Sequence, residues 1–147
     1  GLAWSQDRGT LYFIDSPTRQ VLAFPLTSSG DFLGEPIPCI TIPEAWDALP
    51  DGMCIDAEGM LWIALFGGGA LTRWDPASGL LLERLELPCR QVTSCCFGGP
   101  NLDQLFMTTA RREMDAAAIA AEPLAGGLFR ADVGVKGLPA DCFQVAA

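Results

Sequence analysis

The sequence predicts an all-β protein built from repeated antiparallel sheets, and the main evidence is a phrase that recurs along the chain. Residues 1–15 read GLAWSQDRGTLYFID, and residues 50–64 read PDGMCIDAEGMLWIA. Both pass from a glycine and apolar residues through a polar turn to a leucine and an aromatic residue, so Leu11 and Leu61 stand fifty residues apart. Residues 94–108, SCCFGGPNLDQLFMT, are a weaker third copy. Repeats at this spacing predict the four-stranded sheets of a β-propeller.

The first predicted sheet consists of four short apolar segments separated by turns. Its turns are expected at residues 7–9, 16–18 and 28–30, where polar residues and glycine gather. The strands between them are expected at residues 2–5, 11–15, 20–26 and 38–42.

The second predicted sheet repeats this plan. The sequence DPASG at residues 75–79 is typical of a type I turn, because Pro76 presets φ and Gly79 accepts the left-handed conformation. The strands are expected at residues 53–56, 61–65, 70–74 and 81–87.

The third predicted sheet is less regular. Strands are expected at residues 94–97, 104–109 and 128–132, and the insertion between the last two contains a predicted helix at 115–122 with Asp115 as its cap. The tail from Gly137 contains Pro139 and gives no clear fourth strand. The three units, roughly 1–51, 52–92 and 93–147, are too few to close a ring, so we expect residues 1–147 to be part of a larger propeller whose amino-terminal half is absent.

Composition and charge exclude several functions. Half of the 147 residues are apolar, yet no apolar run reaches the roughly 18 residues of a membrane span. A formal net charge of -9 with scattered basic residues argues against a nucleic-acid partner. We therefore expect neither a membrane nor a nucleic acid as partner.

The six cysteines show no CxxC spacing, and the chain has no histidine, so a zinc finger is excluded. Cys54, Cys95 and Cys96 are interpreted as small buried residues of inner strands, as free cysteines of a reducing compartment usually are. This interpretation predicts a cytoplasmic protein.

Several phrases resemble, in order, the second half of the senescence-marker-protein, gluconolactonase and regucalcin family. The resemblance implies about three blades of a six-bladed propeller, with one divalent metal ion (calcium, or zinc, magnesium or manganese) in the central channel. It also implies hydrolysis of sugar lactones such as gluconolactone, the small-molecule partner. The phrases are GLAWSQDRGTLYFIDS, PDGMCIDAEGMLWIA, LTRWDPASG, LELP, TSCCFGGPNLDQLFMTTAR and AGGLFRADVGVKGLP.

The resemblance assigns Asp51 as a metal ligand and as the catalytic residue that takes a proton from water or orients it. A divalent cation with open positions polarises a carbonyl, and a nearby carboxylate can accept the proton of the attacking water. The residues alone also allow the reading of Asp51 as a turn residue, because Asp-Gly is common in hairpins. The resemblance places the other ligands of the family before Gly1, so this sequence supplies one of the usual three.

Three further residues are candidates for the channel lining. Thr93 occupies in the third unit the place of Asp51 in the second, and Asp47 lies in the loop before Asp51. Trp46, in the same loop, is expected either to shield the channel mouth or to pack over the top of the blade. In contrast, Asp15 and Asp56 are expected to bond to turns and neighbouring backbone. Trp4, Trp62 and Trp74 are expected to pack between blades.

Two classes of function stay open at this point. The first is metal-dependent lactone hydrolysis by the full-length protein, with this chain inactive by itself; the second is a regucalcin-like calcium-binding regulatory protein without catalysis. A third, structural possibility is that two such chains pair to rebuild a ring. With the amino-terminal half absent, apolar residues of the first and third units are expected to be exposed, and the chain is expected to self-associate.

Overall fold

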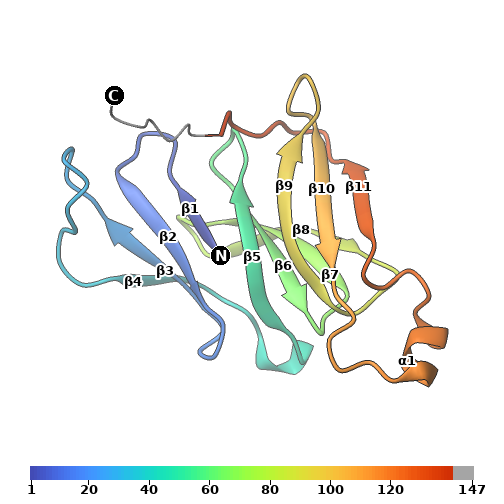
Figure 1. Cartoon of the computed structure of the whole chain (residues 1–147). Coiled ribbons are helices and arrows are strands. Elements are labelled where there is room, and N and C mark those ends of the chain that lie inside the picture. Colours follow the sequence, from blue (N-terminus) through green and yellow to red (C-terminus); the bar gives the residue numbers. More distant parts are fainter. Residues whose placement is uncertain (141–147) are drawn as a thin grey trace, which may run out of the picture.

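A computed structural model describes residues 1–140 of the chain, which form three antiparallel sheets in sequence order (Figure 1). The first sheet has the order β1-β2-β3-β4, the second β5-β6-β7-β8, and the third β11-β10-β9. The strands are β1 (Leu2–Trp4), β2 (Thr10–Asp15), β3 (Gln20–Pro25), β4 (Ile37–Thr41), β5 (Leu49–Ile55), β6 (Leu61–Phe66), β7 (Ala70–Asp75), β8 (Leu80–Glu86), β9 (Val92–Gly98), β10 (Gln104–Thr109) and β11 (Leu128–Asp132).

The predicted strands are confirmed, with shifts at their ends. β5 begins at Leu49, earlier than expected, because Leu49 and Pro50 still pair with the end of β6. A short 3-10 helix, η1 (Glu44–Trp46), precedes it. The predicted helix is α1 (Ala116–Ala121), and the Asp115 side chain caps it by accepting a hydrogen bond of 2.8 Å from the Ala118 amide. The carboxyl-terminal part of the tail lies outside the described residues.

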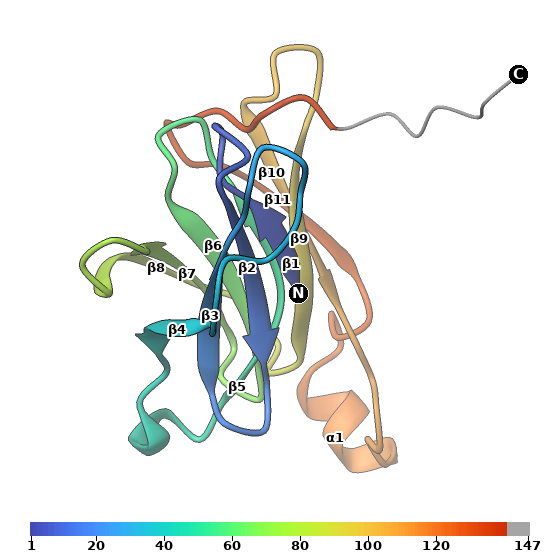
Figure 2. The same ribbon diagram turned by 90° about the vertical axis from the view of Figure 1, so that its left-hand side faces the viewer.

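The first strands of the three sheets, β1, β5 and β9, lie side by side (Figures 1 and 2). Glycine allows this close approach. A Cβ at Gly1 would lie 2.8 Å from the carbonyl oxygen of Asp51, and a Cβ at Gly52 would lie 2.7 Å from the Cα of Ser94. Both distances are shorter than real Cβ contacts, so each inner strand packs almost backbone to backbone against the next. β1, β5 and β9 are called the inner strands below, because they are the edge strands at which neighbouring sheets meet.

The apolar core lies in two layers on either side of the second sheet. Because a sheet covers each of its faces, β6 and β7 are buried along nearly their whole length, and Trp62 is fully buried. The layer between the first and second sheets contains Ala3, Ile14, Val21, Ile40, Leu61, Ile63 and Trp74, among others. The layer between the second and third sheets contains Trp62, Ala64, Leu71, Val92, Cys95, Leu105 and Met107.

A buried ion pair holds the second sheet together. Asp56 is fully buried at the end of β5, and its Oδ2 accepts hydrogen bonds from Arg73 Nε at 2.8 Å and Trp62 Nε1 at 3.0 Å. Its Oδ1 accepts from the amides of Glu58 and Met60, each at 2.9 Å. The carboxylate therefore ties the β5–β6 turn to β6 and β7, which confirms its expected backbone role. No hydrogen-bonding capacity is left toward solvent.

The outer face of the first sheet is apolar and uncovered. Leu2, Trp4 and Phe13 are 52%, 43% and 41% exposed, and their side chains share one face because Leu2 pairs with Phe13 while Trp4 is two residues on. The prediction that Trp4 packs between sheets is wrong for the described residues, since none of their sheets covers this face. The predictions for Trp62 and Trp74 are confirmed, with both rings buried in the core.

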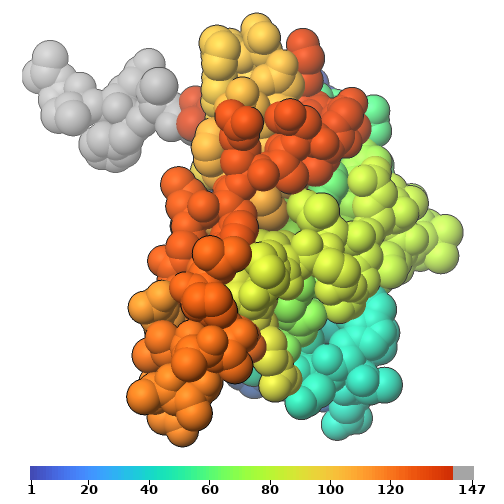
Figure 3. Space-filling view, turned by 90° about the vertical axis from the view of Figure 1, so that its right-hand side faces the viewer, coloured from blue at the N-terminus to red at the C-terminus, as the bar shows by residue number. Residues whose placement is uncertain are grey.

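The third sheet ends the row of sheets on the other side. Figure 3 faces this end, with α1 and β11 in orange and red beside the yellow-green region of β7 and β8. Leu128 of β11 is 68% exposed there.

Cys96 of β9 is exposed, so the prediction that it is buried is wrong. Adjacent residues of a strand point to opposite faces, and Cys95 is the one that faces the core. Cys54 is only half-buried.

Among residues 1–140, the structure contains no helix with the length and apolarity to cross a bilayer.

We expect the chain to self-associate through the outer face of the first sheet. Replacing Phe13 by lysine should weaken this association about tenfold, because the change removes apolar area from the contact and places an unpaired charge in it. Leu80→Lys is the matched control, since Leu80 is 62% exposed on β8 of another sheet. Sedimentation over a range of concentrations measures the effect, and a wild-type chain that stays monomeric at high concentration would contradict it.

Candidate functional site

Asp51 lies within β5 at an irregularity of the strand. Pro50 pairs with Leu65 and Met53 pairs with Ile63, so Asp51 and Gly52 together face the single residue Ala64. This is a β-bulge, which bends a strand and re-aims a side chain. Because Asp51 belongs to a strand that pairs on both sides of the bulge, the alternative that it is a hairpin-turn residue does not apply.

The Asp51 carboxylate is half-buried, and within residues 1–140 no hydrogen bond or ion pair holds it. Burial raises the pKa of Asp51, and the nearby amino group of Gly1 acts in the opposite direction. Aspartates that serve turns behave differently. Hydrogen bonds from Ser78 and the Ala77 amide lower the pKa of Asp75. Asp51 is therefore available to bind a cation or a proton.

Thr93 occupies the corresponding position of β9, and that strand is irregular at the same place. Ser94 pairs with Thr108 and Val92 pairs with Thr109, which leaves Thr93 as the extra residue of the bulge. Its hydroxyl shares a hydrogen bond of 2.8 Å with the Thr108 hydroxyl. Because Gly52 packs directly on Ser94, the two bulges lie on adjacent strands. The structure thus brings Asp51 and Thr93 to matching positions.

Trp46 and Asp47 make their contacts elsewhere. The Trp46 ring lies 6.0 Å from the ring of Trp74, and the Arg84 guanidinium stacks over it at 4.9 Å. Of the two placements expected for Trp46, these contacts match packing over the second sheet. Asp47 ends η1 in the left-handed conformation, and its exposed carboxylate lies 3.9 Å from Arg90. Neither residue contacts Asp51 among the interactions of the described chain.

The described residues do not form a metal site by themselves. No group of three or more histidine, cysteine, aspartate or glutamate side chains within residues 1–140 could hold an ion. Calcium takes six to eight oxygen ligands and magnesium takes six. Asp15 is also occupied, since its carboxylate accepts a hydrogen bond of 2.9 Å from Thr18 in the β2–β3 turn, as expected. Asp51 can supply one ligand of a site that needs others.

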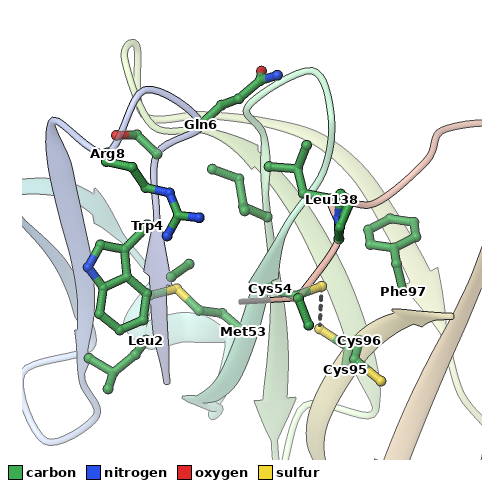
Figure 4. Close-up of a pocket in the computed structure, with 15 residues that line it drawn as sticks. Leu2, Trp4, Gln6, Arg8, Met53, Cys54, Cys95, Cys96, Phe97 and Leu138 are labelled. Atoms are coloured by element: carbon green, nitrogen blue, oxygen red, sulfur yellow. Dashed lines mark hydrogen bonds between the residues drawn. The ribbon is translucent and has the colours of Figure 1, made fainter. Parts of the chain in front are cut away.

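A cavity of about 610 Å³ lies where β1, β5 and β9 meet the tail (Figure 4). Its lining is mostly apolar and includes Trp4, Cys54, Cys96, Phe97 and Leu138, whereas Asp51 and Thr93 do not line it. Sequence reasoning missed this cavity. The sequence signals this cavity only through the apolar residues of the three inner strands. Leu138 lines it because the tail folds back over these strands, which the sequence does not reveal.

The three sheets define a class: all-β proteins built from repeated antiparallel sheets. The sequence profile of the SMP-30/Gluconolactonase/LRE-like region matches residues 1–111, and the chain belongs to this family.

Individual relatives agree with this assignment. Regucalcin of Danio rerio is 43% identical over 140 residues, which are 95% of this chain and 47% of that protein. A calcium-binding regucalcin from Agrobacterium tumefaciens superposes with a TM-score of 0.92 at 32% identity, over 99% of this chain and 49% of that one. A luciferin-regenerating enzyme gives a TM-score of 0.84 at 36% identity, over 94% of this chain and 46% of that one. The chain spans about half the length of the curated relatives it matches.

The pKa of Asp51 leads to a prediction about stability. Because its folded-state pKa is raised, the folded chain binds this proton more tightly than the unfolded chain does. The ionised carboxylate therefore destabilises the fold at neutral pH, and this penalty disappears below the unfolded pKa of about 3.9. We expect Asp51→Asn to raise the melting temperature at pH 7 and to have little effect near pH 4.

The matched control is Asp75→Asn, for which the opposite sign is expected because the folded-state pKa of Asp75 is lowered. Thermal unfolding of both variants across this pH range makes the comparison. A lower melting temperature for Asp51→Asn at pH 7 would show that Asp51 has a structural partner.

Proposed function

We propose that this chain belongs to a divalent-metal-dependent lactonase that hydrolyses sugar lactones such as gluconolactone. In this proposal its three sheets are three blades of a six-bladed propeller, and Asp51 lines the central channel. Membership of the gluconolactonase and regucalcin family supports the chemistry. The observation that carries the role of Asp51 is its half-buried carboxylate on a bulged inner strand, which no hydrogen bond from residues 1–140 engages.

The chemistry of Asp51 follows from its setting. A divalent cation, when bound, polarises the lactone carbonyl and lowers the pKa of a bound water. Asp51 would contribute one carboxylate ligand, and it would accept or orient a proton of the water that attacks the carbonyl carbon. The Thr93 hydroxyl would provide a polar channel wall beside it.

The proposed setting of the protein follows from composition. The five cysteines within the described residues are all free, which suits a reducing compartment such as the cytoplasm. A net charge of -9 disfavours a nucleic-acid partner, so the proposed partner is the small lactone. The ring would be completed by further sheets or by a second copy of the chain.

A second candidate is a calcium-binding regulatory protein without catalysis. The observation that favours it is the similarity to an Agrobacterium regucalcin described as a calcium-binding protein. Both candidates require a cation, but only the lactonase releases acid from gluconolactone. Acid release with and without a chelator therefore separates them.

The experiment uses the purified chain and a full-length protein that carries it. The 147-residue chain is expected to show no chelator-sensitive hydrolysis of gluconolactone, because one carboxylate cannot hold a hard cation against water. In the full-length protein, Asp51→Ala should reduce the rate of hydrolysis about 100-fold to 10,000-fold, because that is the usual contribution of acid–base catalysis. Asp51→Asn should keep more metal than activity.

The control in the full-length protein is Asp15→Asn, which changes a carboxylate of the first sheet that is engaged in a turn. Its hydrolysis rate should stay close to that of the wild type. Chelator-sensitive activity of the 147-residue chain near that of a full-length relative would refute the view that the site needs further ligands.

A further inference from the structure

Two cysteines from different sheets meet in the layer between the second and third sheets. Cys54 lies on β5 and Cys95 on β9, forty-one residues apart in the sequence, and their sulfur atoms are 3.5 Å apart. Figure 4 shows the two sulfurs facing each other. Both cysteines are free thiols. Such a pair needs only small side-chain rotations to approach bonding distance, since the backbones of β5 and β9 are already in close contact.

The hydrogen-bond pattern gives the two thiols different roles. Cys95 is buried, and its thiol donates to the Trp62 carbonyl oxygen at 3.3 Å. A thiol has a single proton, so in this arrangement the Cys54 thiol is the donor of the contact between them and a lone pair of Cys95 faces Cys54. Hydrogen bonding with Cys54 and burial raise the pKa of the Cys95 thiol. Cys95 is therefore the less reactive of the two toward a solute.

Access favours Cys54 as the first thiol to react. Cys54 and Cys95 both line the cavity of about 610 Å³ at the ends of the inner strands, but Cys54 is half-buried whereas Cys95 is buried. A molecule as small as hydrogen peroxide can enter a space of this size. Cys96 lines the same cavity but points from the opposite face of β9, so it does not face Cys54 as Cys95 does.

We propose that Cys54 and Cys95 are a peroxide-sensitive thiol pair whose oxidation forms a disulfide that locks the second sheet to the third. This inference concerns the two thiols and does not depend on lactone hydrolysis.

The chemistry balances with hydrogen peroxide as the oxidant. The Cys54 sulfur loses its proton and attacks one peroxide oxygen; an S–O bond forms, the O–O bond breaks, and the departing hydroxide takes a proton to become water. The Cys95 sulfur then attacks the Cys54 sulfur, the S–S bond forms, and the oxygen leaves as a second water with the Cys95 proton. Two thiols are oxidised and one peroxide is reduced to two waters.

The consequence is mechanical. β5 and β9 carry Asp51 and Thr93, and in the reduced chain non-covalent packing holds their sheets together. A disulfide between Cys54 and Cys95 would close a loop of about forty residues. Such a bond restricts the unfolded chain and resists separation of the two sheets. The oxidised chain should therefore melt at a higher temperature than the reduced chain, and a reductant should reverse the shift.

The test treats the reduced chain with hydrogen peroxide and maps the product by mass spectrometry. We expect a mass lower by two hydrogen atoms and the loss of two free thiols. Digestion with trypsin and a glutamate-specific protease gives residues 45–58, which contain only Cys54, and residues 91–111, which contain Cys95 and Cys96. These two peptides should be joined, and dithiothreitol should separate them.

Variants identify the second sulfur. Cys96→Ser is the matched control and should still give the linked peptides, whereas Cys95→Ser should not. Because the wild-type mapping needs no variant, the proposal stays testable even if Cys95→Ser does not fold. Sulfinic acid at Cys54 without a linked peptide would overturn the proposal, and so would linkage that persists in Cys95→Ser or is lost in Cys96→Ser.

Discussion

The pairing of Asp56 with Arg73 is the interaction on which the arrangement of the sheets depends. The Asp56 carboxylate is fully buried, and a buried charge is tolerated only when hydrogen bonds and a counter-charge replace the water it has lost. Arg73 supplies the charge, and it also reaches Glu58 at 2.6 Å and Glu83 at 3.3 Å on the surface. The pair joins β5 to β7 inside the one sheet that is covered on both faces. The tail docks on the same turn, since the Ala57 amide donates to the Lys136 carbonyl at 2.7 Å.

A rigid second sheet determines where the chemically interesting groups lie. β5 leaves the buried pair at one end and carries the bulge with Asp51 at the other, while Cys54 lies between them and faces the third sheet. The glycine at position 52 then sets the distance to β9, because no side chain separates it from Ser94. One close contact between strands thus places Asp51 next to β9 and brings the two sulfur atoms together. The same contact could not form if either strand carried a bulky residue at the crossing point.

Much of this architecture could be predicted from the sequence, because local patterns determine it. Alternating apolar residues and turn residues gave the strands, and Asp115 before a run of alanines gave the helix. The burial of single residues was harder. Cys96 and Trp4 were expected to be buried, but strand alternation turns Cys96 away from the core, and the face that carries Trp4 has no covering sheet within residues 1–140. The bulge at Asp51 and the meeting of Cys54 with Cys95 depend on contacts between sheets, which no local pattern encodes.

The role of the Asp56–Arg73 pair is tested most directly by comparing the free energies of unfolding of Asp56→Ala and Asp15→Ala. Both variants remove an aspartate that bonds within a turn, but only Asp56 is paired in the core. Denaturant unfolding should show a loss of about 3–5 kcal/mol for Asp56→Ala, because the change leaves Arg73 Nε and Trp62 Nε1 buried without their acceptor, although Glu58 and Glu83 still pair with the outer part of the guanidinium. Asp15→Ala should lose no more than about 1 kcal/mol, as is usual for an exposed polar residue. Equal, small losses for the two variants would contradict the central role of the buried pair.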